Sequence, residues 1–386
     1  MRIGVFVAFA GRNCGGPEVF ERELVRSLVA VNPGHEYHVY CLDRHAPEVI
    51  GLQHPSVTCH VLKPSFRVIS MITSLPRVVA QTQPDIFHAP MVTPPFCPKN
   101  TIMAVQCSSL IRHPEFFPPL VRLRLEFLLY RAIPKSAIVV CPSEHVREVV
   151  QEKFRLPDDR FRVIGPGVSP AFHPIAEEAK RHYLENEHDI RYPYFLLSGR
   201  WEARKNIVKT LEAFAHFKRT YKTEHKLVLT GGRSWGTAEV QAILDHPELK
   251  DMVVDLGKTP IDELPYLYAG AEALVYVSLW EGFGMPIIEA MACGTPVVTS
   301  NTSAMPETAG GHALLVDPNS IEQISAALFR ATQDHAWRQR ARVNGIQRAK
   351  LFTWESVAEK FLGLYDEVGG GTPAGAASGG RTAYSR

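Results

Sequence analysis

The sequence predicts an α/β protein with two domains, each built on a parallel sheet. The 386 residues are more than one hydrophobic core usually serves. In both halves, apolar runs of strand length alternate with amphipathic helical segments joined by short turns, which is typical of a sheet with helices on both faces. A segment that contains Gly and Pro, Arg162–Val168, lies between the halves and predicts a hinge. We therefore expect an N-terminal domain at 1–167 and a C-terminal domain at 168–351.

The N-terminal domain begins with a predicted strand, Ile3–Ala8, a glycine-containing loop and an amphipathic helix over Pro17–Val31. Gly15 and Gly16 come directly before Pro17, which suits the first helical position. The free N–H groups at such a helix start could bind an anion.

Further strands are predicted at His38–Leu42, Thr58–Leu62, Asp85–His88, Thr101–Val105 and Ala137–Cys141. Asp43, after the first of these, could serve as the ribose-binding acid of a dinucleotide site. However, Gly11 to Gly16 does not match G-x-G-x-x-G, so NAD binding is not expected.

The second half alternates regularly. Its predicted strands are 194–198, 226–230, 252–256, 273–277, 296–299 and 313–316, and its predicted helices are 206–220, 237–245, 261–269, 286–293 and 320–332. Ligands of such sheets bind beyond the carboxyl ends of the strands.

One stretch, Ser278–Ser300, carries the strongest functional signal. Glu281 lies in the loop after a buried strand, and Glu289 lies on the helix that follows. Gly282 lets the backbone approach a ligand, and three residues at the helix start could offer backbone donors to a phosphate: Phe283, Gly284 and Met285. Ionised carboxylates only accept hydrogen bonds, so the glutamates suit hydroxyl groups. A phosphate with hydroxyl-rich groups at both ends describes a nucleotide sugar.

The filled pattern over 281–298, E-G-F-G-M-P-x-x-E-A-M-A-C-G-T-P-V-V, resembles the donor-site signature of family-4 retaining glycosyltransferases. The resemblance implies the GT-B architecture, in which two Rossmann-like, doubly wound parallel-sheet domains face a cleft. It also implies transfer of a hexose from a nucleoside diphosphate sugar to a hydroxyl of a glycan, glycolipid or small molecule, with retention. In this pattern Glu281 would orient the donor sugar and Glu289 would bind the ribose.

The loop after the strand 194–198 contains Gly199, Arg200 and Lys205. The two cations resemble the family's pair that binds the donor diphosphate, and Arg204 has a weaker claim to that role. Gly15 and Gly16 would close over the diphosphate from the other domain. Three residues resemble the loops that surround the nucleoside: Gly231, Gly257 and Lys258.

The catalytic-centre loop of the family usually carries a His-Asp pair, whereas this chain has Gln106-Cys107-Ser108 there. We expect Gln106 to act with Glu281, Arg200 and Lys205 in catalysis, by a front-face mechanism in which the leaving phosphate takes the acceptor proton. Alternatively, His88 or His113 occupies this place, or the chain is a catalytically weakened subunit that only binds the nucleotide sugar. An epimerase or a phosphorylase could also use the same architecture.

The composition indicates which classes of partner are not expected. The net charge of +2 does not favour binding of nucleic acid. The seven cysteines lack zinc spacing, so no structural metal is expected, and their odd number argues against a disulfide framework, which fits a cytoplasmic protein. The sequence contains no D-x-D, so we expect metal-independent transfer and no cofactor. The donor sugar and base are not evident from the sequence, although resemblance to mannosyltransferase-like members leans toward GDP-mannose.

Two further regions of the sequence bear on membrane association and on the structure of the C-terminal end. No stretch is apolar enough to span a bilayer, but Pro118–Ile133 mixes Arg122, Arg124 and Arg131 with Leu and Phe. It either packs against its own sheet or lies on an anionic membrane surface as a peripheral contact. The segment 352–368 resembles the family's terminal helix that returns to the first domain, and the Gly-, Ala- and Ser-rich tail 369–386 is expected to be disordered.

Overall fold

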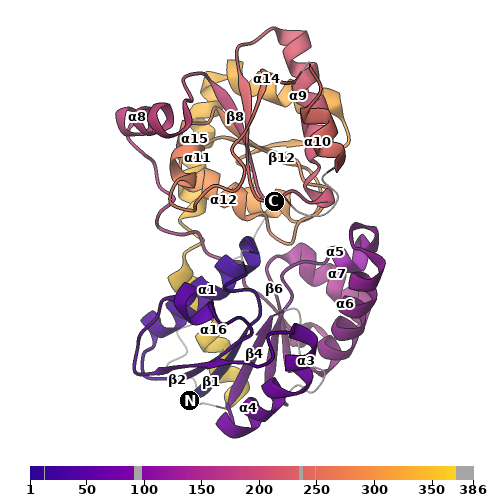
Figure 1. The fold of residues 1–386 in the computed structure, drawn as a ribbon, viewed down its shortest axis with the longest axis vertical. Helices are drawn as coiled ribbons and strands as arrows, with labels where there is room; N and C mark the ends of the chain where they lie inside the picture. The colour runs from indigo at the N-terminus through magenta and orange to yellow at the C-terminus, as the bar shows by residue number, and fades with distance from the viewer. Residues whose placement is uncertain (13, 91–97, 234–237, 248, 371–386) are drawn as a thin grey trace.

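The computed structural model describes residues 1–12, 14–90, 98–233, 238–247 and 249–370. Two parallel sheets with flanking helices form two domains, one above the other along the long axis in Figure 1. The predicted α/β class with two parallel-sheet domains is therefore confirmed. The predicted tail lies outside the described residues from position 371 onward.

The N-terminal sheet has seven described strands in the order β3-β2-β1-β4-β5-β6-β7. Every neighbouring pair is parallel, and Val5 of β1 is in register with Val39 of β2. The strands are β1 (Arg2–Val7), β2 (Glu36–Cys41), β3 (Val57–Val61), β4 (Ile86–Pro90), β5 (Thr101–Ala104), β6 (Ile138–Cys141) and β7 (Phe161–Val163).

The last of these strands corrects one prediction. Arg162–Val168 was expected to be a connecting hinge, but its first residues belong to β7, where Phe161 pairs with Val139 of β6. Three residues are too short for a clear strand pattern in the sequence. The helices of this domain are α1 (Gly16–Val31), α2 (Ala46–Ile50), α3 (Arg67–Ile72), α4 (Ser74–Thr82), α5 (Ser109–Arg112), α6 (Pro119–Ala132) and α7 (Glu144–Phe154).

The C-terminal sheet has six described strands, all parallel, in the order β10-β9-β8-β11-β12-β13. They are β8 (Tyr194–Ser198), β9 (Lys226–Thr230), β10 (Val253–Asp255), β11 (Ala273–Tyr276), β12 (Val297–Ser300) and β13 (Leu314–Val316). The helices are α8 (Glu177–His188), α9 (Ile207–Tyr221), α10 (Ala238–Leu244), α11 (Leu264–Gly270), α12 (Met285–Ala292), α13 (Met305–Ala309), α14 (Ile321–Gln333) and α15 (His335–Ala349).

The last helix, α16 (Trp354–Gly369), leaves the C-terminal domain and packs beside α1 in the N-terminal core, as Figure 1 shows. Phe361 and Tyr365 are fully buried there. The two connections between the domains run side by side, because the N–H of Val168 donates to the carbonyl of Phe352 over 2.8 Å. Any rotation of one domain against the other must therefore bend both segments at this place.

Candidate functional site

The carboxyl ends of β8 and β11 bring together the main charged residues of the predicted site. These strands are parallel neighbours, with Leu196 in register with Leu274. The loops that follow them therefore leave the same edge of the sheet, and the first carries Lys205 while the second carries Glu281. Residues 76 positions apart in the chain thereby meet at the edge where ligands of such sheets bind.

Glu281 is the centre of a buried charge network. Its Oε1 lies 2.6 Å from Nζ of Lys205, and its Oε2 lies 2.6 Å from Nη1 of Arg204. The hydroxyl of Tyr276 donates to Oε1 over 2.8 Å, and the Lys205 ammonium lies 4.7 Å from the centre of the Tyr276 ring. The Glu281 side chain is only 8% exposed, so these partners compensate for most of its lost hydration.

The charges of this network keep the carboxylate ionised. Burial alone would raise the pKa of Glu281, but the charges of Arg204 and Lys205 outweigh it and hold that pKa at about 2. Burial also lowers the pKa of Lys205, although the adjacent Glu281 opposes this shift. An ionised Glu281 can accept hydrogen bonds from sugar hydroxyls but cannot donate a proton near neutral pH.

The two arginines of this loop lie in different surroundings. Arg204, given the weaker claim, holds Glu281, whereas Arg200 is partly exposed beside Gly199 and forms no ion pair or hydrogen bond with the described residues. Ala203–Lys205 forms a tight 3-10 turn, closed by Asn206 at φ 58°. An Asn after two cations is a weak sequence signal for such a turn. The diphosphate contact of Arg200 stays a prediction.

Glu289 lies on α12 and is bonded to a buried tyrosine. The hydroxyl of Tyr268 donates to its Oε2 over 2.8 Å. Burial raises the pKa of Glu289 to about 7, although Tyr268 and Lys205 favour the ionised form. The two glutamates of the motif therefore differ, since Glu281 is ionised and Glu289 changes charge near neutral pH. Sequence reasoning missed both tyrosines, which are ordinary strand and helix residues by pattern.

The start of α12 lies between the two glutamates. Gly284 has φ 99°, and Met285 opens the helix, so the backbone turns sharply here. The side chain of Phe283 is buried, with its ring centre 5.4 Å from that of Phe352 in the interdomain connection. The side chain of Phe283 thus anchors the loop that carries Glu281, and the backbone of Phe283 leads directly into the start of α12.

The loops after β8, β9 and β10 pack tightly at the same edge. The N–H of Gly231 donates to the carbonyl of Gly257 over 2.7 Å. A Cβ added at Gly231 would lie 2.0 Å from the carbonyl oxygen of Gly199, and Gly231 has φ 143°. Both the close contact and the positive φ therefore exclude a side chain at this position. Lys258 follows Gly257 in this group of loops. Their binding of a nucleoside stays a prediction.

The N-terminal domain contacts the loop that carries Glu281. A Cβ added at Gly282 would lie 1.9 Å from the carbonyl oxygen of Gln106, so the two backbones touch. Ser143 caps α7, accepting from the N–H of Val146, and also donates to the carbonyl of Gly282 over 2.8 Å. The predicted catalytic-centre loop and the donor-site loop are therefore in direct contact across the domains.

Trp280 extends this contact. Its Nε1 donates to the hydroxyl of Ser108 over 3.2 Å. The ring centres of His113 and His145 lie 4.7 and 4.8 Å from the ring centre of Trp280. Burial lowers the pKa of His145, so this histidine is neutral in the contact near neutral pH.

The three candidates for the catalytic-centre residue lie in different surroundings. Gln106 follows β5 beside Gly282, and its Nε2 is buried without a hydrogen-bond partner among the described residues. His88 lies in the core, where its Nδ1 is 2.7 Å from the hydroxyl of Tyr365 and burial lowers its pKa to about 4. His113 lies at the edge of the contact, beside Trp280 and Glu115.

The loop between β1 and α1 is open at Gly15 and Gly16. Apart from the adjacent residues of the chain, no atom of the described residues lies within 4 Å of a Cβ added at either position. Glu21 holds the base of this loop, because its carboxylate accepts from the N–H groups of Ala8, Phe9 and Ala10 over 2.7–3.0 Å. Sequence analysis did not identify Glu21, although it lies three and seven positions before Leu24 and Leu28 and therefore shares the buried face of α1.

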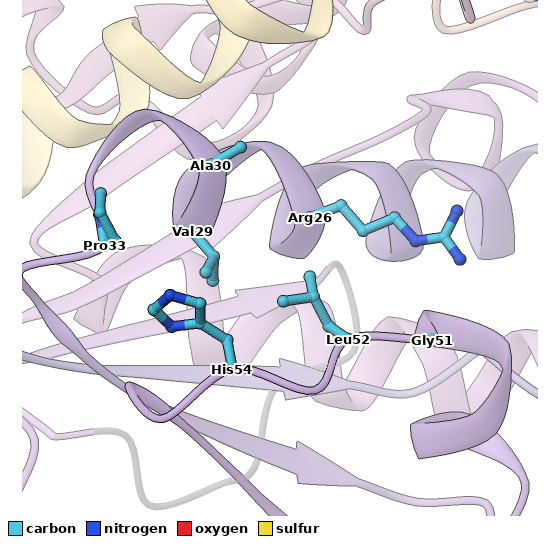
Figure 2. Close-up of a pocket in the computed structure, with 7 residues that line it drawn as sticks. All are labelled: Arg26, Val29, Ala30, Pro33, Gly51, Leu52 and His54. Atoms are coloured by element: carbon cyan, nitrogen blue, oxygen red, sulfur yellow. The ribbon is translucent and has the colours of Figure 1, made fainter.

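A hollow of about 490 Å³ lies elsewhere in the N-terminal domain. Figure 2 shows that its lining comes from α1, from the turn that follows it and from the segment after α2: Arg26, Val29, Ala30, Pro33, Gly51, Leu52 and His54. No residue of the predicted site contributes to it.

The described residues contain no group of three or more His, Cys, Asp or Glu side chains placed to hold a metal ion. They also include no helix that is both long and apolar enough to cross a membrane.

Comparisons with known families match both halves of the chain. The family model described as Glycosyltransferase Family 4 matches residues 14–172, and the model described as Glycosyl transferases group 1 matches residues 180–348. O-antigen chain mannosyltransferase B of Escherichia coli is 30% identical over 280 residues, which cover 72% of this chain and 74% of that protein. O-antigen chain mannosyltransferase RfbU of Salmonella typhimurium is 28% identical, over 61% of this chain and 62% of that protein.

Solved structures share the fold. Sucrose-phosphate synthase from Thermosynechococcus elongatus has a TM-score of 0.79 at 21% identity, covering 96% of this chain and all of that one. Anabaena HepE, solved in complex with UDP-glucose, has a TM-score of 0.75 at 16% identity and covers 95% of this chain and all of that one. At these identities the likeness concerns the fold alone.

Proposed function

The chain is a glycosyltransferase of family 4, and from this we propose that it moves a hexose from a nucleoside diphosphate sugar to an acceptor hydroxyl, with retention and without a metal ion. The observation that carries the proposal is the network of Arg204, Lys205 and Glu281 at the carboxyl ends of β8 and β11. Two partly buried cations and one ionised acceptor there suit a ligand that carries both negative charge and hydroxyl groups.

Lys205 and Arg200 are the proposed contacts of the diphosphate. Lys205 is held by Tyr276 and Glu281, so its ammonium is oriented before the donor arrives. Arg200 lies at the same strand end with its guanidinium unengaged by the described residues, so it can turn toward an anion. Such fixed cations stabilise the charge that develops on a leaving diphosphate. This role, together with the absence of D-x-D from the sequence, supports metal independence.

Transfer would proceed on one face of the sugar ring. The bond between the anomeric carbon and the phosphate oxygen breaks, and a bond from the acceptor oxygen to the same carbon forms on the same face. The acceptor proton moves to the leaving phosphate oxygen, which yields a glycoside and a nucleoside diphosphate. Glu281 would accept hydrogen bonds from the sugar hydroxyls, and Glu289 would accept from the ribose.

Gln106 would donate its amide N–H to the donor sugar. Buried donors are usually paired, and Nε2 of Gln106 has no partner among the described residues. A sugar hydroxyl at the domain contact would satisfy it. Because Gln does not titrate, this contact would not change with pH.

For the donor we propose GDP-mannose, and the support is the two relatives that are named as mannosyltransferases. A thermal-shift screen against GDP-, UDP-, ADP- and dTDP-sugars tests this choice. A donor at 100 times its dissociation constant adds ~2.7 kcal/mol to the free energy of unfolding. The largest shift is expected with GDP-mannose, and a larger shift with another donor would replace it.

Turnover assays separate the rival activities. A transferase needs donor and acceptor together, an epimerase releases product without an acceptor, and a phosphorylase requires phosphate in place of the nucleotide. A protein that binds the donor but never transfers or hydrolyses it across a broad acceptor panel would instead be a binding subunit.

A further inference from the structure

The exposed apolar side chains of the chain are concentrated on one part of the N-terminal domain. Within the described residues, fifteen large apolar side chains are exposed, and eight of them belong to two short segments. These eight are Phe66, Val68, Ile69 and Ile72 around α3, and Leu120, Leu123, Phe127 and Tyr130 on α6. We call this surface the α3–α6 face. Single exposed apolar residues are common, but a concentration of this kind marks an interaction surface.

Helix α6 has two apolar faces. Leu128, Leu129 and Ala132 are buried against the domain. The four exposed residues recur at intervals of three, four and three positions, the spacing of a single stripe along a helix. Leu120 is 84% exposed, and Leu123 is 67% exposed. Packing on its own sheet therefore accounts for only one side of this helix.

The region of helix α3 contributes the other four exposed side chains. Phe66, just before the helix, is 72% exposed, and Ile69 and Ile72 are about half exposed. Met71 of α3 is buried in the same core cluster as Leu128 of α6, so the two helices are anchored in one core. Figure 1 shows both helices on the same side of the N-terminal domain.

The charge of this region differs from that of the rest of the chain. Residues 49–143 contain nine Lys and Arg but three Asp and Glu, whereas the remaining residues contain 33 Lys and Arg and 37 Asp and Glu. On α6, Arg124 and Arg131 are exposed, and Arg131 lies 5.3 Å from the ring centre of Phe127. The acidic residue of the helix, Glu126, is paired with Arg122 over 2.9 Å. Apolar side chains flanked by unneutralised arginines are complementary to an anionic lipid surface.

We propose that the α3–α6 face binds anionic lipid and holds the protein on a membrane surface. A second copy of the chain is a poorer occupant, because a two-fold contact would bring the same arginines together. A nucleic acid would satisfy the arginines but not the eight apolar side chains. The proposal is independent of donor and acceptor, since the binding that it predicts requires neither.

Flotation with vesicles tests the proposal on the full chain. Wild-type protein should float with vesicles of equal parts phosphatidylglycerol and phosphatidylcholine and stay unbound with pure phosphatidylcholine. The double variant Leu123→Ser/Phe127→Ser should bind at least ~10-fold more weakly, because apolar burial is lost. Arg124→Gln/Arg131→Gln should bind roughly 30-fold more weakly, and added salt should weaken wild-type binding.

The matched control is Val343→Ser/Leu351→Ser, which removes side chains of 48% and 61% exposure from the C-terminal domain and should bind like wild type. All variants should melt like wild type, since the changed residues are on the surface. Absence of wild-type flotation, equal binding to both vesicle types, or equal loss in the control would overturn the proposal. Dimerisation that Leu123→Ser/Phe127→Ser abolishes, without lipid binding by wild type, would assign the face to a second copy instead.

Discussion

At the scale of single residues, the motif predicted which groups meet but not how they are arranged. Glu281 and Lys205 follow neighbouring parallel strands, so their proximity could be deduced from strand order. The contact of Arg204 could not, because side-chain direction in the 3-10 turn Ala203–Lys205 depends on local backbone angles. Tyr276 and Tyr268 were also missed, since a tyrosine in an apolar run carries no signal that its hydroxyl holds a glutamate.

The diphosphate contacts give the first prediction. Lys205→Ala and Arg200→Ala should each lower turnover by roughly 10²–10³-fold, because each removes one preorganised cation from the leaving group. Lys209→Ala, which removes a surface cation paired with Glu212, is the control and should retain full activity. Steady-state kinetics of transfer measure all three, and full activity in both site variants would refute the diphosphate assignment.

The two glutamates should separate by role. Glu281→Gln should chiefly reduce turnover and should also lower the melting temperature, because two buried cations lose their counter-charge. Glu289→Gln should chiefly weaken nucleoside diphosphate binding, by ~1.5–3 kcal/mol for hydrogen bonds to a charged acceptor. Calorimetry with the free nucleoside diphosphate decides between them, and a reversed pattern would exchange the two roles.

Glu289 also predicts a pH dependence. Its pKa of about 7 in the folded protein lies above the ordinary value for a glutamate. The folded protein therefore binds this proton more tightly than the unfolded chain does, and at low pH the neutral carboxyl contributes to the free energy of unfolding. That contribution is lost as the pH rises through 7, where the ionised form becomes the better acceptor for ribose. Wild-type nucleotide affinity should therefore weaken as the pH falls below about 7. The nucleotide itself also titrates, and this affects its affinity for both proteins. Glu289→Gln should show only that effect and should lack the further loss of affinity below pH 7.

Gln106 gives a prediction that distinguishes three residues. Gln106→Ala should cause a large loss of transfer but should leave the shape of the pH profile unchanged, because an amide does not titrate. His88→Ala should act mainly on stability, since His88 contacts Tyr365 in the core. A loss of transfer confined to His113→Ala, with Gln106→Ala unaffected, would move the catalytic centre to His113.

At the scale of elements, the strands of the sheets were largely predictable and several helices were not. Helix α15 was absent from the predicted elements because its buried positions are Trp337, Ala341, Gly345 and Ala349. Small residues at a four-residue interval fit against another helix, but they do not form the apolar stripe that marks a helix in a sequence. The partner is α12, which carries Glu289, so an element missed by sequence analysis supports the site.

This contact can be tested with two helical glycines. A Cβ added at Gly345 would lie 3.2 Å from Cγ of Met291 in α12. At Gly363 in α16, an added Cβ would have no atom of the described residues within 4 Å apart from the helix's own backbone and chain neighbours. Gly345→Leu should destabilise the protein by ~1–3 kcal/mol through overpacking and should weaken nucleotide binding. Gly363→Leu should be neutral or stabilising, because Leu favours the helix over Gly by ~0.8 kcal/mol. Urea denaturation compares them, and equal effects would contradict the packing account.

At the scale of the whole molecule, chain length and alternation predicted two parallel-sheet domains, and the structure confirms them. The contact between the domains could not be predicted. Trp280 contacts both His113 and His145, and Gly282 touches Gln106, although nothing in the spacing of these residues indicates that they meet. Long-range contacts of this kind depend on how the two domains sit together, which no local pattern records.

We propose a retaining transfer in which fixed cations, instead of a metal ion, stabilise the leaving diphosphate. The most direct test is a nuclear magnetic resonance measurement of the product formed in excess EDTA from the donor selected by thermal shift. We predict undiminished transfer and a glycoside with the anomeric configuration of the donor. An inverted product, or transfer that stops in EDTA and returns with Mg²⁺ or Mn²⁺, would contradict the account.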